Sequence, residues 1–182
     1  MLGTITVVPT DTTLETERLR LRPLETTDLE PLTLLRRDPA MMRYMGDGHV
    51  SDRAESESWL RWHMDIWKID GYSLFAAELK PENRFVGWIG VTKPYWFSEM
   101  MPTPEIGWFV ERAQWGLGLA TEGAEAALRF AFDTVGIERV IGIYNAENAA
   151  SGRVMEKIGM TFWKELPHPN FGFPLRIYEA RR

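Results

Sequence analysis

The sequence predicts an α+β domain whose central sheet is mixed, mostly antiparallel and flanked by helices. Three observations support this class: a strand followed by two helices, then a hairpin, then a strand, helix, strand, helix and two strands. The chain has 182 residues, which suits one domain with a sizeable core. We expect a single domain over residues 16–182, after a flexible leader at residues 1–15 that shows no periodicity.

The opening segment predicts one strand and two helices. Residues 18–22 alternate polar and apolar side chains, which is typical of a half-buried strand. Leucines at helical spacing follow between Asp28 and Asp38, so we expect a helix there. A second helix is expected at residues 52–69, where tryptophan and isoleucine recur every three or four positions before Gly71.

The middle of the chain predicts strands. Residues 72–79 and 84–91 are separated by Lys-Pro-Glu-Asn, which is typical of a turn, so they predict a hairpin. The segment 93–104 is irregular and rich in proline, aromatic residues and methionine, which suits a cleft wall. Residues 105–111 then predict the next strand.

The last third predicts a parallel crossover. A loop with glycines at residues 112–119 leads into a long helix with one apolar stripe, which ends at Gly136. The strand expected at residues 139–144 completes a strand, helix, strand unit and implies a parallel pair. Asn148 is expected to cap a short helix. Two strands complete the pattern, at residues 161–166 and 175–180.

Composition excludes several classes of protein. There is no cysteine, hence no disulfide and no thiolate nucleophile, and the three histidines show no metal-ligand spacing, so we expect no metal. A formal net charge of −5 argues against a nucleic-acid partner, which needs clustered Lys and Arg. No apolar run reaches the ~20 residues that span a bilayer. The N-terminal stretch makes a poor signal peptide. We therefore expect a cytoplasmic protein with neither nucleic-acid nor membrane partners.

A glycine-containing segment, WGLGLATE at residues 115–122, lies between a predicted strand and a predicted helix. A helix N-terminus offers unpaired N–H groups and a positive dipole end, which attract phosphate. Gly116 and Gly118 allow a tight turn and a close approach to a ligand. A turn needed only for packing would use the same glycines. Thr121 stands where a dinucleotide-binding loop has its third glycine, and no Gly-Lys-Ser/Thr is present.

This segment resembles motif A of the GNAT N-acetyltransferases, in the W-G-x-G-x-A-T-E form of the RimJ/RimL-like subgroup. Residues 18–24 with Asp28 resemble the opening strand and helix of that family. Residues 148–160 resemble its N-x-x-S…E-K-x-G-F segment, with Met160 in place of Phe. The likeness runs over about residues 16–180 in the order of the family. It implies the GNAT fold, with a sheet splayed at a cofactor cleft.

The resemblance further implies that acetyl-coenzyme A binds in this cleft as a co-substrate. Its pyrophosphate would lie on backbone N–H groups of the loop, and its pantetheine arm along the strand at residues 108–110. Many members have Gln or Arg where this chain has Ala113, a small change if backbone groups do most of the binding. The cofactor-binding residues are expected to be Trp108, Phe109, Val110, Gln114, Trp115, Gly116, Leu117, Gly118, Leu119, Ala120, Thr121, Asn148 and Ser151.

Transfer of an acetyl group to an amine needs a neutral amine and a proton for the departing thiolate. Glu105 is the candidate base, acting directly or through water; the alternative is a surface carboxylate at the end of a strand. Many family members donate the proton from a tyrosine, but Met155 occupies that position here. Ser151 is therefore the candidate donor, although it could simply bond the backbone of its helix. Tyr144 is a second hydroxyl in the same region.

The expected function is transfer of an acetyl group from acetyl-coenzyme A to a primary amine, directly in a ternary complex. The acceptor would be a protein N-terminus or a small amine. The alternatives are a GNAT-fold module that binds acyl-coenzyme A without turnover, and a purely structural domain. Neither the acceptor nor the choice between monomer and homodimer follows from the sequence. Candidates to line the acceptor site are Tyr95, Trp96 and Phe97, with ordinary packing as the alternative. His168 lies in a loop that could close over the substrate, with a structural role as the alternative.

Overall fold

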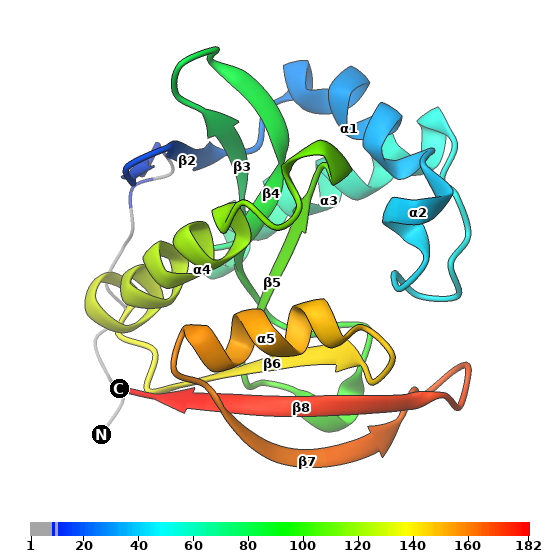
Figure 1. Cartoon of the computed structure of the whole chain (residues 1–182). Coiled ribbons are helices and arrows are strands. Elements are labelled where there is room, and N and C mark those ends of the chain that lie inside the picture. The colour runs from blue at the N-terminus through cyan, green and yellow to red at the C-terminus, as the bar shows by residue number, and fades with distance from the viewer. Residues whose placement is uncertain (1–8, 10) are drawn as a thin grey trace.

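Eight strands form one mixed sheet in the computed structural model, which describes residue 9 and residues 11–182 (Figure 1). The strand order is β1-β2-β3-β4-β5-β6-β8-β7. Only β5 and β6 are parallel, and the other neighbouring pairs are antiparallel. The predicted α+β class, with its mixed and mostly antiparallel sheet, is confirmed.

The strand bounds lie within two residues of the predicted ones. Most of the leader expected at residues 1–15 lies outside the described residues, but its end forms a short strand that pairs with β2. The strands are β1 (Leu14–Glu15), β2 (Leu19–Pro23), β3 (Leu74–Leu79), β4 (Arg84–Thr92), β5 (Glu105–Val110), β6 (Arg139–Asn145), β7 (Thr161–Pro167) and β8 (Pro174–Arg181).

In the described part of the chain, five α-helices, three 3-10 turns and one π-helical turn connect these strands. The helix predicted to end at Gly136 begins as α4 and continues as the π-helical turn η4, a change of pitch that the apolar stripe did not indicate. The α-helices are α1 (Leu29–Arg36), α2 (Pro39–Met42), α3 (Arg53–Asp70), α4 (Leu119–Arg129) and α5 (Ala149–Lys157). The turns are η1 (Thr26–Asp28), η2 (Ser98–Met100), η3 (Arg112–Gln114) and η4 (Phe130–Val135).

Helix α3 begins and ends where its sequence dictates. The Asp52 carboxylate accepts a hydrogen bond from the Glu55 backbone N–H at 2.8 Å, and the Glu55 carboxylate accepts one from the Asp52 N–H at 2.8 Å. This reciprocal capping box satisfies two N–H groups that the helix leaves unpaired. Gly71 ends the helix in the left-handed region, at φ 75°.

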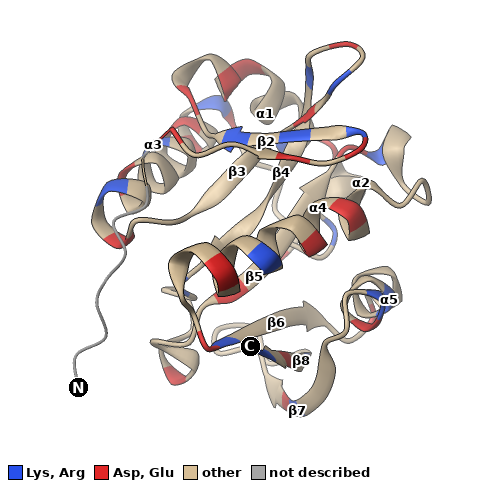
Figure 2. Cartoon of the chain, turned by 90° about the vertical axis from the view of Figure 1, so that its left-hand side faces the viewer, with Lys and Arg blue, Asp and Glu red and all other residues tan. Residues whose placement is uncertain are grey.

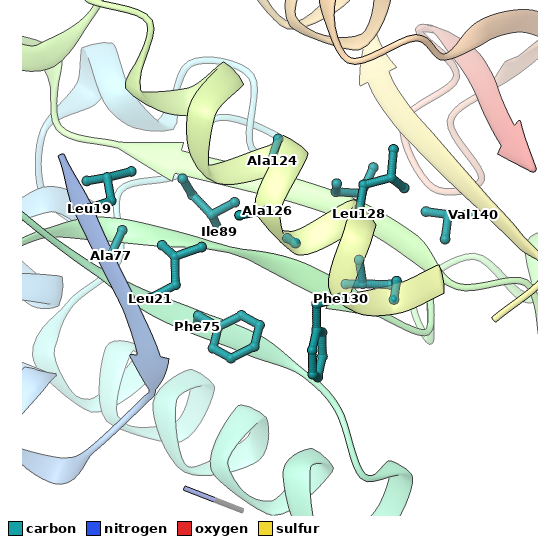
Figure 3. Close-up of a cluster of buried hydrophobic side chains, with 14 of the residues drawn as sticks. Leu19, Leu21, Phe75, Ala77, Ile89, Ala124, Ala126, Leu128, Phe130 and Val140 are labelled. Carbon is teal, nitrogen blue, oxygen red and sulfur yellow. The ribbon is translucent and has the colours of Figure 1, made fainter. Parts of the chain in front are cut away.

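The sheet buries apolar side chains on both faces. Helix α4 covers one face, and the side chains beneath it form the core shown in Figure 3, among them Leu19, Leu21, Phe75, Ala77 and Ile89. Helices α1 to α3 pack on the opposite face, where the buried side chains include Leu32, Leu60, Leu74, Ala76 and Trp88. Successive side chains of a strand point to opposite faces of the sheet, so each strand contributes to both apolar layers. The sheet therefore lies between the two layers of helices.

The sheet opens between β5 and β6. These strands pair only at Glu105↔Ile141 and Ile106↔Gly142. In contrast, β5 stays paired with β4 along its whole length, from Thr92↔Glu105 to Gly87↔Val110. Beyond Ile106 the two parallel strands diverge, with α4 on one side of the opening and α5 on the other (Figure 1). The predicted splay is therefore confirmed.

Basic and acidic residues are intermixed along α3 and α4 (Figure 2). Within the described part of the chain, no helix combines the length and the apolar character needed to cross a membrane. The same residues hold no cluster of three or more His, Asp or Glu suited to a metal ion.

Candidate active site

The N-terminus of α4 presents free backbone N–H groups at the opening of the sheet. Gly118 precedes the helix with φ 82°, a conformation that other residues rarely adopt. The first hydrogen bond of the helix runs from the Glu122 N–H to the Gly118 carbonyl at 3.0 Å. The N–H groups of Leu119, Ala120 and Thr121 consequently have no partner within the helix, and such groups at a helix N-terminus are suited to an anion.

A hydrogen-bond network fastens this loop to the connection between β1 and β2. The Glu122 carboxylate accepts bonds from the Thr16 hydroxyl at 2.6 Å, the Arg18 backbone N–H at 2.8 Å and the Arg18 Nε–H at 2.7 Å. Burial raises the pKa of Glu122, but these bonds outweigh it and hold that pKa below its usual range. Arg18 also donates from Nη1 to the Leu117 carbonyl at 2.8 Å. Sequence analysis missed this support, although an acidic residue in a first helical turn was a visible signal.

The first residues of the loop use their backbone N–H groups in turns within the loop itself. The Gln114 N–H donates to the Glu111 carbonyl at 3.0 Å, and the Trp115 N–H donates to the Arg112 carbonyl at 3.1 Å. The Trp115 indole N–H donates to the Val110 carbonyl at 2.7 Å. Gln114 and Trp115 therefore line the cleft without offering it a free backbone N–H group.

A cleft of about 460 Å³ lies at the opening between β5 and β6. Both candidate catalytic residues, Glu105 and Ser151, line it. Leu117 does not, because its side chain is 56% exposed outside the cleft. The cleft is also lined by the other residues expected to bind the cofactor: Trp108, Phe109, Val110, Gln114, Trp115, Gly116, Gly118, Leu119, Ala120, Thr121 and Asn148.

Helix α5 supplies the far wall of this cleft. Asn148 caps it as predicted, with its Oδ1 accepting a hydrogen bond from the Ser151 N–H at 3.3 Å. Met155, in the position of the usual tyrosine, is only 1% exposed and packs closely over Gly142, so its side chain fills core. Tyr144 on β6 also lines the cleft, and its hydroxyl lies next to Gly152 of α5. Ser151 and Tyr144 are thus both hydroxyl-bearing residues of the cleft walls.

Glu105 lies at the base of the opening, at one of the two paired positions of β5 and β6. The Trp96 indole N–H donates to its Oε2 at 3.1 Å. Although the residue as a whole is only partly shielded from solvent, burial of the carboxyl raises its pKa to about 7, against the opposing effect of the Trp96 hydrogen bond. A carboxyl group with this pKa exchanges a proton near neutral pH, as a general base must.

A second cleft, of about 640 Å³, meets the first one at Glu105, Gly107 and Tyr144. Trp96 lines it, together with its neighbour Tyr95, as expected. For Phe97 the packing alternative holds: the residue is 4% exposed and packs with Met100 and Ile141 in a separate apolar cluster.

The loop between β7 and β8 contributes His168 to the second cleft. Its ring stacks on that of Trp96, with the centroids 5.2 Å apart and the planes 24° apart. Burial lowers the pKa of the imidazole. His168 is therefore in contact with the residue that holds Glu105, and the loop forms part of the wall.

Helix α3 forms a further wall that sequence analysis missed. Trp59, Trp62 and His63 line the second cleft. His63 Nδ1 lies 3.2 Å from the Ser73 hydroxyl, and burial, with the nearby Arg36, lowers the pKa of the imidazole to about 3. The three-residue spacing of the tryptophans is also the spacing of core positions, so nothing in the sequence distinguished a cleft wall from a core.

Comparison with known proteins agrees with this geometry. A family model described as an acetyltransferase (GNAT) domain matches residues 18–161. The chain is 34% identical over 171 residues to the uncharacterized protein YkkB of Bacillus subtilis (strain 168), covering 93% of this chain and 96% of that protein. The crystal structure of a GNAT-family acetyltransferase from Bacillus anthracis superposes with a TM-score of 0.79 at 30% identity, covering 93% of this chain and 98% of the other.

The chain therefore belongs to the GNAT acetyltransferase family, whose members use acetyl-coenzyme A. Its structural relatives include RimL, the ribosomal L7/L12 α-N-protein acetyltransferase, solved in complex with coenzyme A. That structure has a TM-score of 0.79 at 14% identity, covering 93% of this chain and 98% of RimL, and it shows a common fold.

Proposed function

We propose that this protein transfers an acetyl group from acetyl-coenzyme A to a primary amine within a ternary complex. The acceptor is a small amine or a protein N-terminus. One observation carries the proposal: Glu105, with a pKa near 7, lies where a coenzyme cleft and a second cleft meet. Two clefts that share one proton acceptor allow both substrates to be present when the proton is transferred. The cytoplasmic location and the oligomeric state stay predictions.

The residues of the first cleft fit acetyl-coenzyme A. The free N–H groups of Leu119, Ala120 and Thr121 suit a pyrophosphate. The edge of β5 from Trp108 to Val110, left without a paired strand on the β6 side, suits an amide-bearing arm. When bound, the coenzyme supplies a thioester whose acetyl group passes to the amine nitrogen as the carbon–sulfur bond breaks.

The protein's own groups complete the proton balance. Glu105 accepts the proton that the amine loses, directly or through water. Backbone N–H groups of β5 stabilise negative charge on the acetyl oxygen. The Ser151 hydroxyl is our proposed proton donor to the sulfur, and the Tyr144 hydroxyl is the alternative donor. Met155 has no such proton, and its burial excludes it from this role.

The direct test is a thiol-release assay on the purified protein with acetyl-coenzyme A and a panel of amines and peptides. We expect amine-dependent release of coenzyme A thiol together with the matching N-acetyl product. Tight coenzyme binding with no thiol release would instead favour a binding module, an alternative that the buried Met155 keeps open. Failure of saturating coenzyme to raise the melting temperature would leave only a structural domain.

A further inference from the structure

The second cleft is lined by aromatic side chains that stay partly exposed to solvent. Rings from α3, from the segment after β4 and from the loop between β7 and β8 all border it. Trp62 is 42% exposed, Tyr95 40%, Trp96 44% and Phe171 48%. Large aromatic side chains that remain open to solvent within one cleft mark a binding surface for an apolar, flat group.

These rings are held in fixed positions despite their exposure. Trp62 and Tyr95 meet edge to face, with the centroids 5.4 Å apart and the planes 82° apart. The Tyr95 hydroxyl donates to the Asp70 carboxylate at 2.6 Å, and Trp96 is held by Glu105 on one side and by the His168 ring on the other. A wall anchored in this way needs little ordering when a ligand binds.

The charges of the cleft suit a ligand with one amino group. Lys93 lines the cleft, but its ammonium group pairs with Asp70, whose side chain is only 5% exposed. Among the described lining residues Glu105 is the only carboxylate, and it makes no ion pair within the described structure. An acceptor with several ammonium groups would leave the others without a partner, at a cost in binding.

Building on the proposed function, we infer that the acceptor is a small arylalkyl monoamine. Its aromatic body packs against the Trp62, Tyr95 and Trp96 rings, and its amino group lies at Glu105, where the coenzyme cleft begins. The cleft volume of about 640 Å³ falls within the roughly 300–1,000 Å³ typical of small-molecule sites. Ring stacking supplies the specificity, and the single carboxyl group orients the nitrogen.

The test compares kcat/KM for matched acceptors with the full chain and acetyl-coenzyme A. Tryptamine and 2-phenylethylamine represent the proposed class, and 2-cyclohexylethylamine has similar apolar area without an aromatic ring. Spermidine, kanamycin and a short peptide beginning with alanine represent the other acceptors. We expect the two arylalkylamines to be used best, with 2-phenylethylamine preferred about 10-fold over its saturated counterpart.

A variant of one ring of the cleft distinguishes loss of aromatic contact with the acceptor from a general loss of structure or coenzyme binding. Trp62→Leu should raise KM for tryptamine about 10-fold, with kcat and the coenzyme-induced rise in melting temperature retained. Trp163→Leu is the matched control: that tryptophan is 40% exposed on β7 and lies over the Arg139 guanidinium, outside both clefts, so KM should not change.

Two results would overturn the inference and leave the proposed function standing. One is a higher kcat/KM for spermidine, kanamycin or the peptide than for either arylalkylamine. The other is equal use of the phenyl and cyclohexyl amines together with an unchanged KM in Trp62→Leu. Absence of thiol release with every acceptor would overturn the proposed function and this inference with it.

Discussion

Glu105 and His63 line the same cleft, and burial disfavours the charged form of both. It raises the pKa of the Glu105 carboxyl to about 7 and lowers that of the His63 imidazole to about 3. Desolvation disfavours the charged form of an acid and of a base alike, so the two pKa values shift in opposite directions. Glu105 consequently exchanges a proton near neutral pH, whereas His63 stays neutral and only forms part of the cleft wall.

The buried His63 should make the protein less stable as the pH falls. Its pKa is about 3 in the folded chain and 6.5 when exposed, so below pH 6.5 only the unfolded chain takes up the proton. The free energy of unfolding therefore decreases by up to about 1.4 kcal/mol per pH unit between pH 6.5 and 3 from this group. His63→Asn should show a shallower slope, measured by urea unfolding at pH 4.5 to 7.

The prediction concerns how the free energy of unfolding changes with pH and not its absolute value, because removing the ring also changes packing with Trp59 and Trp62. Glu105 contributes a slope of the opposite sign between pH 4.5 and 7, since the folded chain holds its proton longer there. That contribution is common to both proteins and cancels in their difference. Identical slopes in the wild type and His63→Asn would show that His63 titrates normally in the folded state.

At the scale of elements, we propose that the coenzyme binds at the start of α4 and not at the far end of the helix. Gly118 before α4 and Gly136 after η4 have φ of 82° and 81°, so alanine is strained to a similar degree at both. Each substitution should lower the free energy of unfolding by about 1 kcal/mol. Only Gly118→Ala should also weaken coenzyme A binding, because only its neighbours present free N–H groups.

Isothermal titration of coenzyme A into both variants measures this difference. We expect Gly118→Ala to raise Kd at least ~10-fold, which corresponds to 1.4 kcal/mol, and Gly136→Ala to leave Kd unchanged. Equal Kd values in the two variants would remove the α4 N-terminus from the coenzyme site.

Elements governed by local pattern were predictable from the sequence. The hairpin of β3 and β4 followed from a turn between apolar runs, and the Asn148 cap followed from side-chain chemistry at a helix start. The phosphate-loop interpretation needed the family resemblance, because two glycines alone fit a packing turn equally well. Features that depend on distant segments meeting were not predictable: Arg18 supports the loop from 99 to 104 residues away. The aromatic wall is of the same kind, since its rings come from three separate stretches of the chain.

At the scale of the whole molecule, the opening divides the sheet into two halves. One half holds β1 to β5 under α4, and the other holds β6 to β8 under α5. A coenzyme in the cleft would contact both halves, so its binding should stabilise the fold as a unit. At a coenzyme A concentration of 100 times Kd, the free energy of unfolding should rise by about 2.7 kcal/mol.

For a chain of this size that gain corresponds to a rise in melting temperature of roughly 5–10 °C, which differential scanning fluorimetry detects. ATP, which has phosphates but no pantetheine arm, serves as the control and should give a smaller rise. An equal rise with both ligands would mean that the open edge of β5 contributes nothing to binding.

The pH dependence of kcat in the wild type and in Glu105→Gln tests the central claim most directly. Below a pH of about 7 the Glu105 carboxyl is protonated and cannot accept the amine proton, so kcat should fall about 10-fold per pH unit in the wild type. Glu105→Gln should lose this inflection and about 100-fold in kcat at pH 7.5, with an unchanged Kd for coenzyme A. Glu99→Gln, which removes an exposed carboxylate paired with Lys164, should behave as the wild type. A Glu105→Gln profile with the wild-type inflection and rate would contradict the account.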